Sequence, residues 1–319
     1  MSIRNVLRKF KKNSLILWLW NEYRRLKGIY QLRQITDFEF VKSKYVNSTG
    51  NSLNLSTPTR FTEKLQWLKL FYRDSKIEIC SDKYTAREYV KEQGYEFILN
   101  KLIASYNSVD EIDFDSLPEQ FVLKVSHGSG WNIVCKDKKK INWRIYKLII
   151  KSWMKQNLYI YGREWNYEHL EPKIIIEKYI DSGDGQLTDY KFFCFNGEPK
   201  FVQVDRDRFK KHKQTYYDMR WEKLPFTTGH IAVDEVCPEK FEEMKKIASE
   251  LSIPFPHVRI DFYNVKGKIY FGEFTYFDGS GFYNYKPDEW DYHWGKELQL
   301  PQPNYNLELY DFVCKQGET

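Results

Sequence analysis

Residues 258–275 (VRIDFYNVKGKIYFGEFT) carry acidic and basic side chains at the spacing of a β-hairpin. Two runs rich in β-branched and aromatic residues flank Lys-Gly, which is typical of a hairpin turn. If Val265 pairs with Ile269 across a three-residue turn, Asp261 lies opposite Glu273. Facing carboxylates repel each other on a sheet unless a cation lies between them. The pair therefore predicts a site for Mg²⁺, which prefers carboxylate oxygens and takes further ligands from water and phosphate.

Arg259 and Thr275 would share the polar face of this hairpin, because side chains on a strand alternate with a period of two. An arginine there could neutralise charge that develops on a substrate oxygen. The other face would carry the apolar side chains that pack on a core: Ile260, Phe262, Tyr270 and Phe274.

A second constellation, LKVSHGSGWN at residues 123–132, places a lysine on a strand before a short glycine-containing turn. Backbone N–H groups of such a turn can approach phosphate oxygens while Lys124 supplies positive charge. The segment matches neither the Walker pattern nor G-x-G-x-x-G. A turn that only connects two strands is the alternative, and the residues alone leave it open.

Two charged pairs accompany apolar strands further along the chain. Glu177 and Lys178 follow three isoleucines, and burying them would be costly unless they are paired or lead into a cleft. Asp189 and Lys191 share one face of a strand. For Glu177 and Lys178, the alternative is a strand that emerges into solvent. For Asp189 and Lys191, the alternative is an ion-pair ladder on the protein surface.

The elements that position these residues follow from periodicity. Helices are predicted for residues 59–74, with Thr62 as cap, and for residues 81–94, with Ser81 or Asp82 as N-cap and Gly94 as the stop. Further helices are predicted for residues 142–159 and 237–251.

Strands are predicted on both sides of the glycine-containing turn, at residues 174–180, and in a hairpin around Asn196-Gly197. These strands would form antiparallel or mixed sheets with helices interposed. The pattern predicts an α+β fold rather than a doubly wound one.

Composition limits the class of protein. The chain of 319 residues is 42% hydrophobic and 29% charged, as in a globular protein of two or three modules. A net charge of +6 is modest, and we expect no nucleic-acid partner. The five cysteines are scattered without a Cys-x-x-Cys motif, which argues against a disulfide framework or zinc site and fits a reducing cytosol: Cys80, Cys135, Cys194, Cys237 and Cys314.

The N-terminal residues 1–30 are basic and amphipathic. Ile3, Val6, Leu7 and Phe10 recur at helical spacing among lysines and arginines. The SLILWLW run that follows is too short to span a bilayer, and no cleavage site of a secretory signal follows it. Such a helix can lie on an anionic membrane surface; a helix docked on the protein's own core is the equal alternative.

In their order along the chain, these signals resemble the ATP-grasp superfamily. The amino-acid sequences of four segments resemble those of its TupA-like branch, named for teichuronopeptide biosynthesis: SDKYTAREYV, FVLKVSHGSGWN, DYKFFCFNGEPKF and RIDFY…GKIYFGEFTYFDGSG. The resemblance covers about residues 60–300 and implies an α+β ATP-grasp fold with the nucleotide held between two subdomains. It also implies four parts: residues 1–58, a basic and aromatic helical segment; 59–105, a helical part of the ATP-grasp region; 106–180, a lid subdomain with the glycine-rich loop; and 181–319, a C-terminal subdomain with the metal site.

The resemblance implies a role for each matching residue. Lys124 and Lys191 would contact the ATP phosphates and, with Arg259, form the catalytic set. The remaining nucleotide contacts would come from the loop (Ser126, His127, Gly128, Ser129, Gly130), from the adenine hinge (Glu177, Lys178, Tyr179, Ile180) and from Asp189. Asp261 and Glu273 match the metal-binding acids, with Thr275 at a position where many ATP-grasp ligases carry asparagine.

The activity implied is that of an ATP- and Mg²⁺-dependent carboxylate–amine ligase that forms an amide through an acyl-phosphate. Its expected setting is surface polysaccharide or teichuronopeptide-type polymer synthesis, with a sugar acid and an amino acid as substrates, in the cytoplasm or at the inner face of the cell membrane. Three alternatives remain: a glycosyltransferase using Asp205-x-Asp207, a sugar or polyol kinase on the same fold, and a non-catalytic scaffold.

Overall fold

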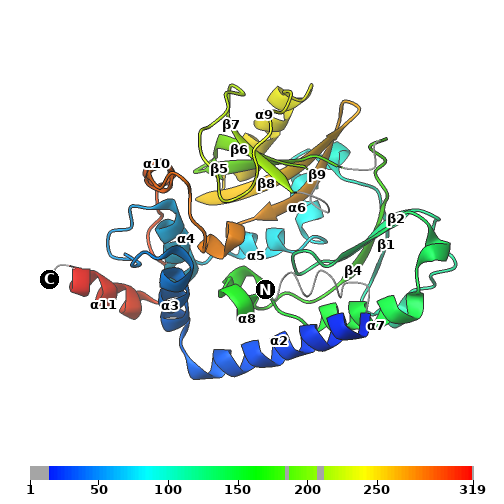
Figure 1. Cartoon of the computed structure of the whole chain (residues 1–319), viewed down its shortest axis with the longest axis horizontal. Helices are drawn as coiled ribbons and strands as arrows, with labels where there is room; N and C mark the ends of the chain where they lie inside the picture. The colour runs from blue at the N-terminus through cyan, green and yellow to red at the C-terminus, as the bar shows by residue number, and fades with distance from the viewer. Residues whose placement is uncertain (1–13, 184–186, 207–211, 318–319) are drawn as a thin grey trace. The chain divides into compact units, whose positions relative to one another are not determined.

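The computed structural model describes residues 14–183, 187–206 and 212–317 (Figure 1). The chain divides into two compact units. The first comprises residues 1–36, 82–84 and 100–180, and the second comprises residues 37–81, 85–99 and 181–319. The predicted Ile3, Val6, Leu7 and Phe10 stripe lies outside the described residues, whereas SLILWLW begins a helix.

The first unit holds a four-stranded antiparallel sheet in the order β1-β4-β2-β3. Its described elements, with η for 3₁₀-helices, are α2 (Ser14–Gln34), β1 (Leu102–Tyr106), η2 (Val109–Glu111), β2 (Phe121–Val125), β3 (Asn132–Cys135), η3 (Lys138–Lys140), α7 (Trp143–Met154), α8 (Tyr159–Gly162), η4 (Trp165–Tyr167) and β4 (Ile174–Lys178). As its continuous apolar run predicted, β4 is buried on both faces through Ile174, Ile175 and Ile176. Phe121, Leu123 and Val125 alternate inward along β2, which turns Lys124 to the other face.

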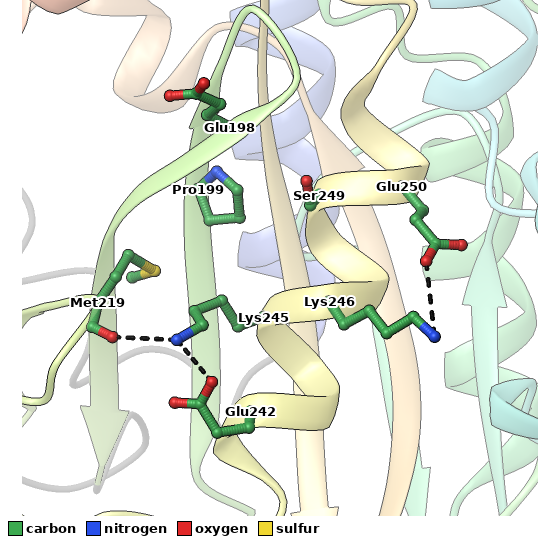
Figure 2. A pocket seen from close by; sticks show the side chains of 8 residues that line it. All are labelled: Glu198, Pro199, Met219, Glu242, Lys245, Lys246, Ser249 and Glu250. Atoms are coloured by element: carbon green, nitrogen blue, oxygen red, sulfur yellow. Dashed lines mark hydrogen bonds and ion pairs between the residues drawn. The ribbon is translucent and has the colours of Figure 1, made fainter.

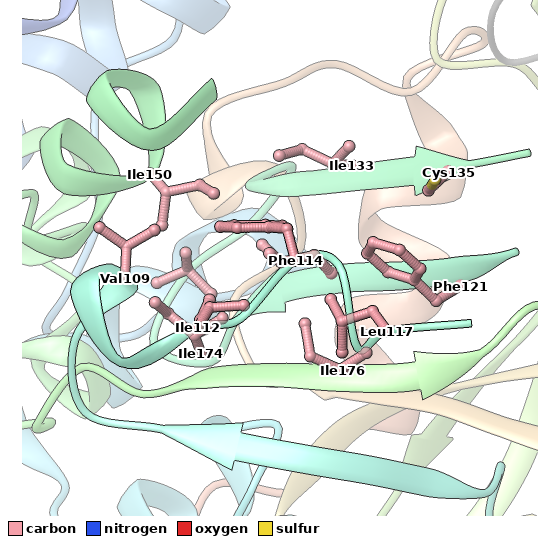
Figure 3. Close-up of a cluster of buried hydrophobic side chains, with 12 residues drawn as sticks. Val109, Ile112, Phe114, Leu117, Phe121, Ile133, Cys135, Ile150, Ile174 and Ile176 are labelled. Carbon is pink, nitrogen blue, oxygen red and sulfur yellow. The ribbon is translucent and has the colours of Figure 1, made fainter. Parts of the chain in front are cut away.

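A cluster of buried side chains fixes β2, β3 and β4 (Figure 3). Phe121, Ile133 and Ile176 meet there with Phe114 and with Ile150 of α7. Asn142 caps α7 with its side chain, which accepts a hydrogen bond from the Ile145 N–H. The strand that carries Lys124 is therefore held by a core on one face and by two neighbouring strands.

The second unit holds a five-stranded antiparallel sheet in the order β7-β6-β5-β8-β9. Its described elements are α3 (Asp37–Thr49), α4 (Phe61–Phe71), α5 (Ser75–Ser81), α6 (Ala86–Glu92), η1 (Glu96–Ile98), β5 (Asp189–Phe195), β6 (Glu198–Arg206), β7 (Lys213–Asp218), α9 (Phe241–Ser252), β8 (His257–Val265), β9 (Lys268–Thr275), η5 (Asp278–Gly281), α10 (Glu289–Glu297) and α11 (Leu307–Gly317). The α9 helix covers one face of this sheet, where Phe241 stacks on Phe192 at 5.8 Å between ring centroids. Helices and antiparallel sheets together confirm the predicted α+β class.

Several helix boundaries differ from the prediction; the helix predicted for residues 142–159 ends at Met154, and the one predicted for residues 237–251 begins at Phe241. Arg60, not Thr62, is the N-cap of α4; the Thr62 N–H and hydroxyl instead donate to the buried carboxylate of Asp291 at 2.9 and 2.6 Å. Residues 81–94 do not form one helix, because α5 ends at Ser81 and α6 begins after Thr85. Gly94 does follow the end of α6, in the left-handed conformation with φ of 84°.

The β8–β9 hairpin has a shorter turn than predicted. Val265 pairs with Lys268, not Ile269, so the turn is the two residues Lys266-Gly267. A bulge at Gly272 then adds one residue to β9, and beyond it Asp261 faces Glu273 as predicted. A Cβ at Gly272 would lie 2.9 Å from the Asp261 carbonyl oxygen, which explains a glycine at the bulge.

Because of this bulge, the apolar face of the hairpin differs from the predicted one. Ile260, Phe262 and Phe274 are buried as expected. Tyr270 is not part of this face, because it pairs with Tyr263 on the polar side. Ile269 and Phe271 are buried in its place.

Candidate functional site

Polar side chains form a continuous row across the sheet of the second unit. The strand register aligns Tyr216, Gln203, Lys191, Asp261 and Glu273 on β7, β6, β5, β8 and β9, in that spatial order. A parallel row aligns Gln214, Asp205 and Asp189. Because side chains alternate between faces, both rows lie opposite the face that α9 covers.

Lys191 lies among three carboxylates in this row. Its Nζ forms a close ion pair with Asp261 Oδ2 and lies 3.7 Å from Asp189 Oδ1 and 4.0 Å from Asp205 Oδ2. All four side chains are buried. The D-x-K motif is thus part of an internal charge cluster and not a surface ion-pair ladder.

Arg259 is the second cation of the cluster. Its Nε donates to Asp261 Oδ1 at 2.7 Å, and its Nη2 donates to Asp261 Oδ2 at 2.9 Å and to Thr275 Oγ1 at 3.0 Å. Nη1 forms a close ion pair with Asp278, and Nη2 lies 3.8 Å from Glu273 Oε1. Burial alone would lower the pKa of Arg259, but the charges of Asp261 and Asp278 outweigh it and raise the pKa well above its usual value.

Asp278 is a site residue that the sequence analysis missed. It lies in η5, where Gly279 and Ser280 adopt left-handed conformations. Two side chains of α4 hold this turn: Gln66 donates to the Gly281 carbonyl at 2.8 Å, and Lys69 donates to the Ser280 carbonyl at 2.7 Å. The FDGSG sequence after the last strand is the only local signal of such a turn.

Five carboxylates gather around Lys191 and Arg259 in the described part of the cluster, namely those of Asp189, Asp205, Asp261, Glu273 and Asp278. A ring nitrogen of His212 lies 3.2 Å from Asp205 Oδ1. Carboxylate oxygens are the ligands that hard divalent cations prefer, so this donor set fits a divalent cation.

The protein ligands alone do not complete a metal site. Across residues 14–183, 187–206 and 212–317, no three His, Cys, Asp or Glu side chains are arranged to hold a metal by themselves. Asp261 and Glu273 would therefore share Mg²⁺ with oxygens of a nucleotide and of water. Thr275 faces Arg259 across the ladder, as predicted, and its hydroxyl accepts the Arg259 hydrogen bond.

Asp205 belongs to a buried polar network. Gln203 Nε2 donates to both of its carboxylate oxygens at 3.1 Å, and Gln214 Nε2 donates to Oδ1 at 3.2 Å. Asp207, the other half of the D-x-D string, lies outside the described residues. Nothing in the spacing along the chain predicted that Asp205 lies beside Lys191.

In the first unit, Lys124 and Glu177 form an ion pair. Lys124 Nζ lies 2.7 Å from Glu177 Oε2, and the glutamate side chain is almost fully buried. Register explains the contact: Val122, two residues before Lys124, pairs with Glu177 across the β2–β4 ladder. Glu177 is thus paired inside the unit and does not emerge into solvent.

The glycine-rich loop is anchored at its first residues. The Ser126 N–H donates to the Lys173 carbonyl at 2.8 Å, and a ring nitrogen of buried His127 lies 2.9 Å from the Gln156 carbonyl. Burial lowers the pKa of His127 below its usual value. Gly128 is buried against Trp131, whose ring would be 2.1 Å from a Cβ at this position. Ser129 and Gly130 are the exposed part of the loop.

Lys83 lies beside this loop and was also missed. Its N–H donates to the Ser126 carbonyl at 3.1 Å, and its Nζ donates to the Gly128 carbonyl at 2.5 Å. Its sequence signal is the SDKYT string at residues 81–85, part of a segment that resembles the family.

Of the four residues of the predicted hinge, Glu177 and Lys178 form the end of β4, and Tyr179 and Ile180 follow it. The Lys178 N–H donates to the Lys101 carbonyl at 2.9 Å, and Asn100 Nδ2 donates to the Lys178 carbonyl at 2.8 Å. Adenine contacts through the backbone would therefore fall to Tyr179 and Ile180.

A hollow of about 510 Å³ lies elsewhere in the second unit, between α9 and the start of β6 (Figure 2). Lys245 pairs there with Glu242 at 2.6 Å, and Lys246 with Glu250 at 3.8 Å. In each pair the lysine neutralises the charge of the glutamate. The helix α9 lies on the opposite face of the sheet from the acidic rows. This hollow is therefore separate from the candidate site.

A mixed α+β protein whose sheet carries R-x-D on one strand and a facing glutamate on the next has the organisation expected of the ATP-grasp class. Residues 63–299 match the family model described as TupA-like ATPgrasp. The chain therefore belongs to the TupA-like ATP-grasp family and has the ATP-grasp fold.

Solved structures of ligases are among the similar proteins. The D-alanine–D-alanine ligase from Bacillus anthracis is 18% identical over 67% of this chain and 58% of its own, with a TM-score of 0.38. The enzyme of the same name from Helicobacter pylori is 15% identical over 76% and 70%, with a TM-score of 0.40. The L-amino acid ligase from Bacillus licheniformis is 18% identical over 64% and 42%, with a TM-score of 0.36. This chain thus spans less than two thirds of the first of these ligases. No curated protein matches the chain.

Proposed function

We propose that this protein is an ATP-dependent carboxylate–amine ligase. The observation that carries the proposal is the polar row of Lys191, Asp261 and Glu273 with Arg259, in a chain of the TupA-like ATP-grasp family. Such a site combines fixed cations for a transferring phosphoryl group with acids for its metal.

The reaction would take place in two steps. A substrate carboxylate attacks the γ-phosphorus of ATP, the bond to ADP breaks, and an acyl-phosphate forms. An amine then attacks the acyl carbon, the carbon–oxygen bond to phosphate breaks, and the amine loses a proton. Both steps develop negative charge on oxygen, which nearby cations stabilise.

The residues divide this work by their chemistry. Lys191 and Lys124 would bind phosphate oxygens as point charges, whereas Arg259 would orient the reacting carboxylate with its planar fork. Ser129 and Gly130 would offer backbone N–H groups to the phosphates. Asp261 and Glu273 would hold Mg²⁺, which when bound neutralises phosphate charge.

The proposed setting is the synthesis of a surface polysaccharide or teichuronopeptide-type polymer, with a sugar acid as the carboxylate and an amino acid as the amine. Product analysis tests both the chemistry and the setting. ADP and phosphate that form only when a uronic acid and an amino acid are both present support the ligase.

Two other products would contradict the ligase. ADP with a phosphorylated sugar would indicate a kinase, and UDP released from a sugar nucleotide would indicate a glycosyltransferase. The reaction with Asp261→Asn is the matched control, because turnover that survives this change does not come from the proposed site.

A further inference from the structure

The outward face of α2 carries an apolar stripe. Leu19, Tyr23, Leu26 and Tyr30 are 53, 54, 59 and 65% exposed, respectively. Their spacing of four, three and four residues aligns them along one side of the helix over about 16 Å. Apolar side chains gathered in this way mark an interaction surface more often than single exposed ones do.

The opposite face of α2 fixes the helix to its own unit. Buried Gly28 packs on Ile160 of α8, where a Cβ would lie 3.1 Å from Ile160 Cδ1. Nearer the edge of the stripe, Glu22 accepts a hydrogen bond from Ser152 of α7 at 3.2 Å. Figure 1 shows α2 running beside α7. One face of the helix is therefore docked on its own unit, as one of the two alternatives predicted, and the face with the apolar stripe is exposed.

Positive charge surrounds the apolar stripe. Exposed Lys27 and Arg33 lie on either side of it, within about 70° of its middle. Glu22 is the only acidic residue among residues 1–36, and it pairs with Arg25 at 2.9 Å. The 13 residues before α2 add Arg4, Arg8, Lys9, Lys11 and Lys12 and no acid.

We propose that this face of α2 binds the protein to an anionic membrane surface, with Leu19, Tyr23, Leu26 and Tyr30 in the headgroup region and Lys27 and Arg33 against lipid phosphates. Leucine and tyrosine flanked by basic residues are the composition of helices that lie in the interface plane. No helix in the described part of the chain is long and apolar enough to cross a membrane.

A second copy of α2 is the rival occupant, because the same spacing is that of a coiled-coil seam. Pairing two copies would bring Lys27 and Arg33 of both close together with no exposed acid on the helix to compensate them. The charge of the face therefore favours an anionic lipid surface over self-association. The inference does not depend on the ligase chemistry.

Flotation of the full-length protein with vesicles of phosphatidylcholine, with and without phosphatidylglycerol, tests the proposal. We expect binding only to the anionic vesicles, and less of it at higher salt. Lys27→Glu/Arg33→Glu should lower the partition coefficient by at least about tenfold. Lys296→Glu/Lys315→Glu, which makes the same charge change on exposed helices of the second unit, should bind nearly as wild type does.

A second pair of variants tests the apolar stripe. Leu19→Ala/Leu26→Ala should lower binding several-fold, whereas Leu148→Ala/Leu307→Ala, at similarly exposed helical leucines, should not. Equal binding by all variants, equal binding to both kinds of vesicle, or no binding would overturn the proposal. A dimer in sedimentation that only Leu19→Ala/Leu26→Ala dissociates, without vesicle binding, would assign the face to self-association. Because flotation needs no turnover, a failed ligase assay does not affect the result.

Discussion

Arg259 and Asp261, two residues apart on β8, form a two-point ion pair in which Nε and Nη2 donate to the two carboxylate oxygens at 2.7 and 2.9 Å. The same guanidinium contacts Asp278 and lies 3.8 Å from Glu273. The facing carboxylates of the hairpin thus have a cation of the protein's own beside them. Arg259 is held by several partners at once, and its orientation is fixed before any substrate arrives.

Arg259→Lys tests whether turnover needs only the positive charge of Arg259 or also its planar guanidinium group. A lysine ammonium keeps the positive charge but cannot donate along both oxygens of a carboxylate. We expect kcat to fall by about 100-fold or more, while Mg-ATP still raises the melting temperature. Arg220→Lys, at an exposed arginine of the same unit, should leave kcat unchanged. Wild-type turnover by Arg259→Lys would remove Arg259 from the reacting centre.

Asp261→Asn and Glu273→Gln should both abolish turnover but differ in stability. From sequence, either amide would relieve repulsion between facing acids. The structure changes this expectation for Asp261, because it accepts charged hydrogen bonds from Lys191 and Arg259, and an amide cannot accept them all. We expect Asp261→Asn to lose about 2 kcal/mol or more of unfolding free energy.

Glu273→Gln is the matched comparison. Its side chain is 27% exposed and lies 3.8 Å from Arg259, so we expect a change in unfolding free energy within about 1 kcal/mol. Denaturant unfolding without ligand measures both variants, and ATP consumption measures turnover. Rapid ATP consumption by either amide variant would contradict the metal assignment.

Lys124→Ala should weaken ATP binding and also lower stability, because it removes the ammonium that lies 2.7 Å from the buried Glu177 carboxylate. The double variant Lys124→Ala/Glu177→Gln separates the two effects. It should recover most of the lost melting temperature, since the buried group at position 177 no longer carries a charge, and still show no added stabilisation by Mg-ATP. Stabilisation of the double variant as large as that of wild type would exclude Lys124 from the nucleotide site.

His257 should make the protein less stable in mild acid. Its ring is buried among aromatic side chains, and burial lowers its pKa to about 3. Between about pH 6.5 and pH 3 the unfolded chain binds a proton that the folded chain does not, so stability falls as pH falls through this window. At pH 5 the loss is about 2 kcal/mol.

His257→Phe should flatten this pH dependence by about that amount between pH 7 and pH 5, measured by denaturant unfolding at each pH. His169→Gln, at an exposed histidine, should leave the slope unchanged. An unaltered slope in His257→Phe would assign the acid sensitivity to another group, of which buried His127 is the next candidate.

Local patterns predicted much of the fold. The isoleucine run of β4, the hairpin at Asn196-Gly197 and the R-x-D strand are as expected, because a strand's own residues determine which side chains share a face. The break between α5 and α6 was not predicted, since residues 81–94 have no proline or internal glycine to mark it.

The site was less predictable where distant segments meet. Asp205 lies beside Lys191 only because β6 pairs with β5, and Asp278 reaches Arg259 only because Gln66 and Lys69 of α4 hold its turn. Such contacts depend on tertiary packing, which no spacing along the chain encodes. The contact between Lys83 and the Gly128 carbonyl likewise depends on tertiary packing.

The bulge at Gly272 determines whether the Glu273 side chain faces Asp261 or points to the apolar side of the hairpin. A two-residue turn pairs only residues an odd number of positions apart, as with Val265 and Lys268, but Asp261 and Glu273 are 12 positions apart. Without the bulge, Asp261 would face Gly272, and the Glu273 side chain would point to the apolar side with Phe262. Deletion of Gly272 itself would therefore leave a regular hairpin in which Asp261 still faces the glutamate. A one-residue insertion or deletion elsewhere between Asp261 and Glu273, with the two-residue turn and the bulge kept, would exchange the two faces of β9 and turn the glutamate to the apolar side.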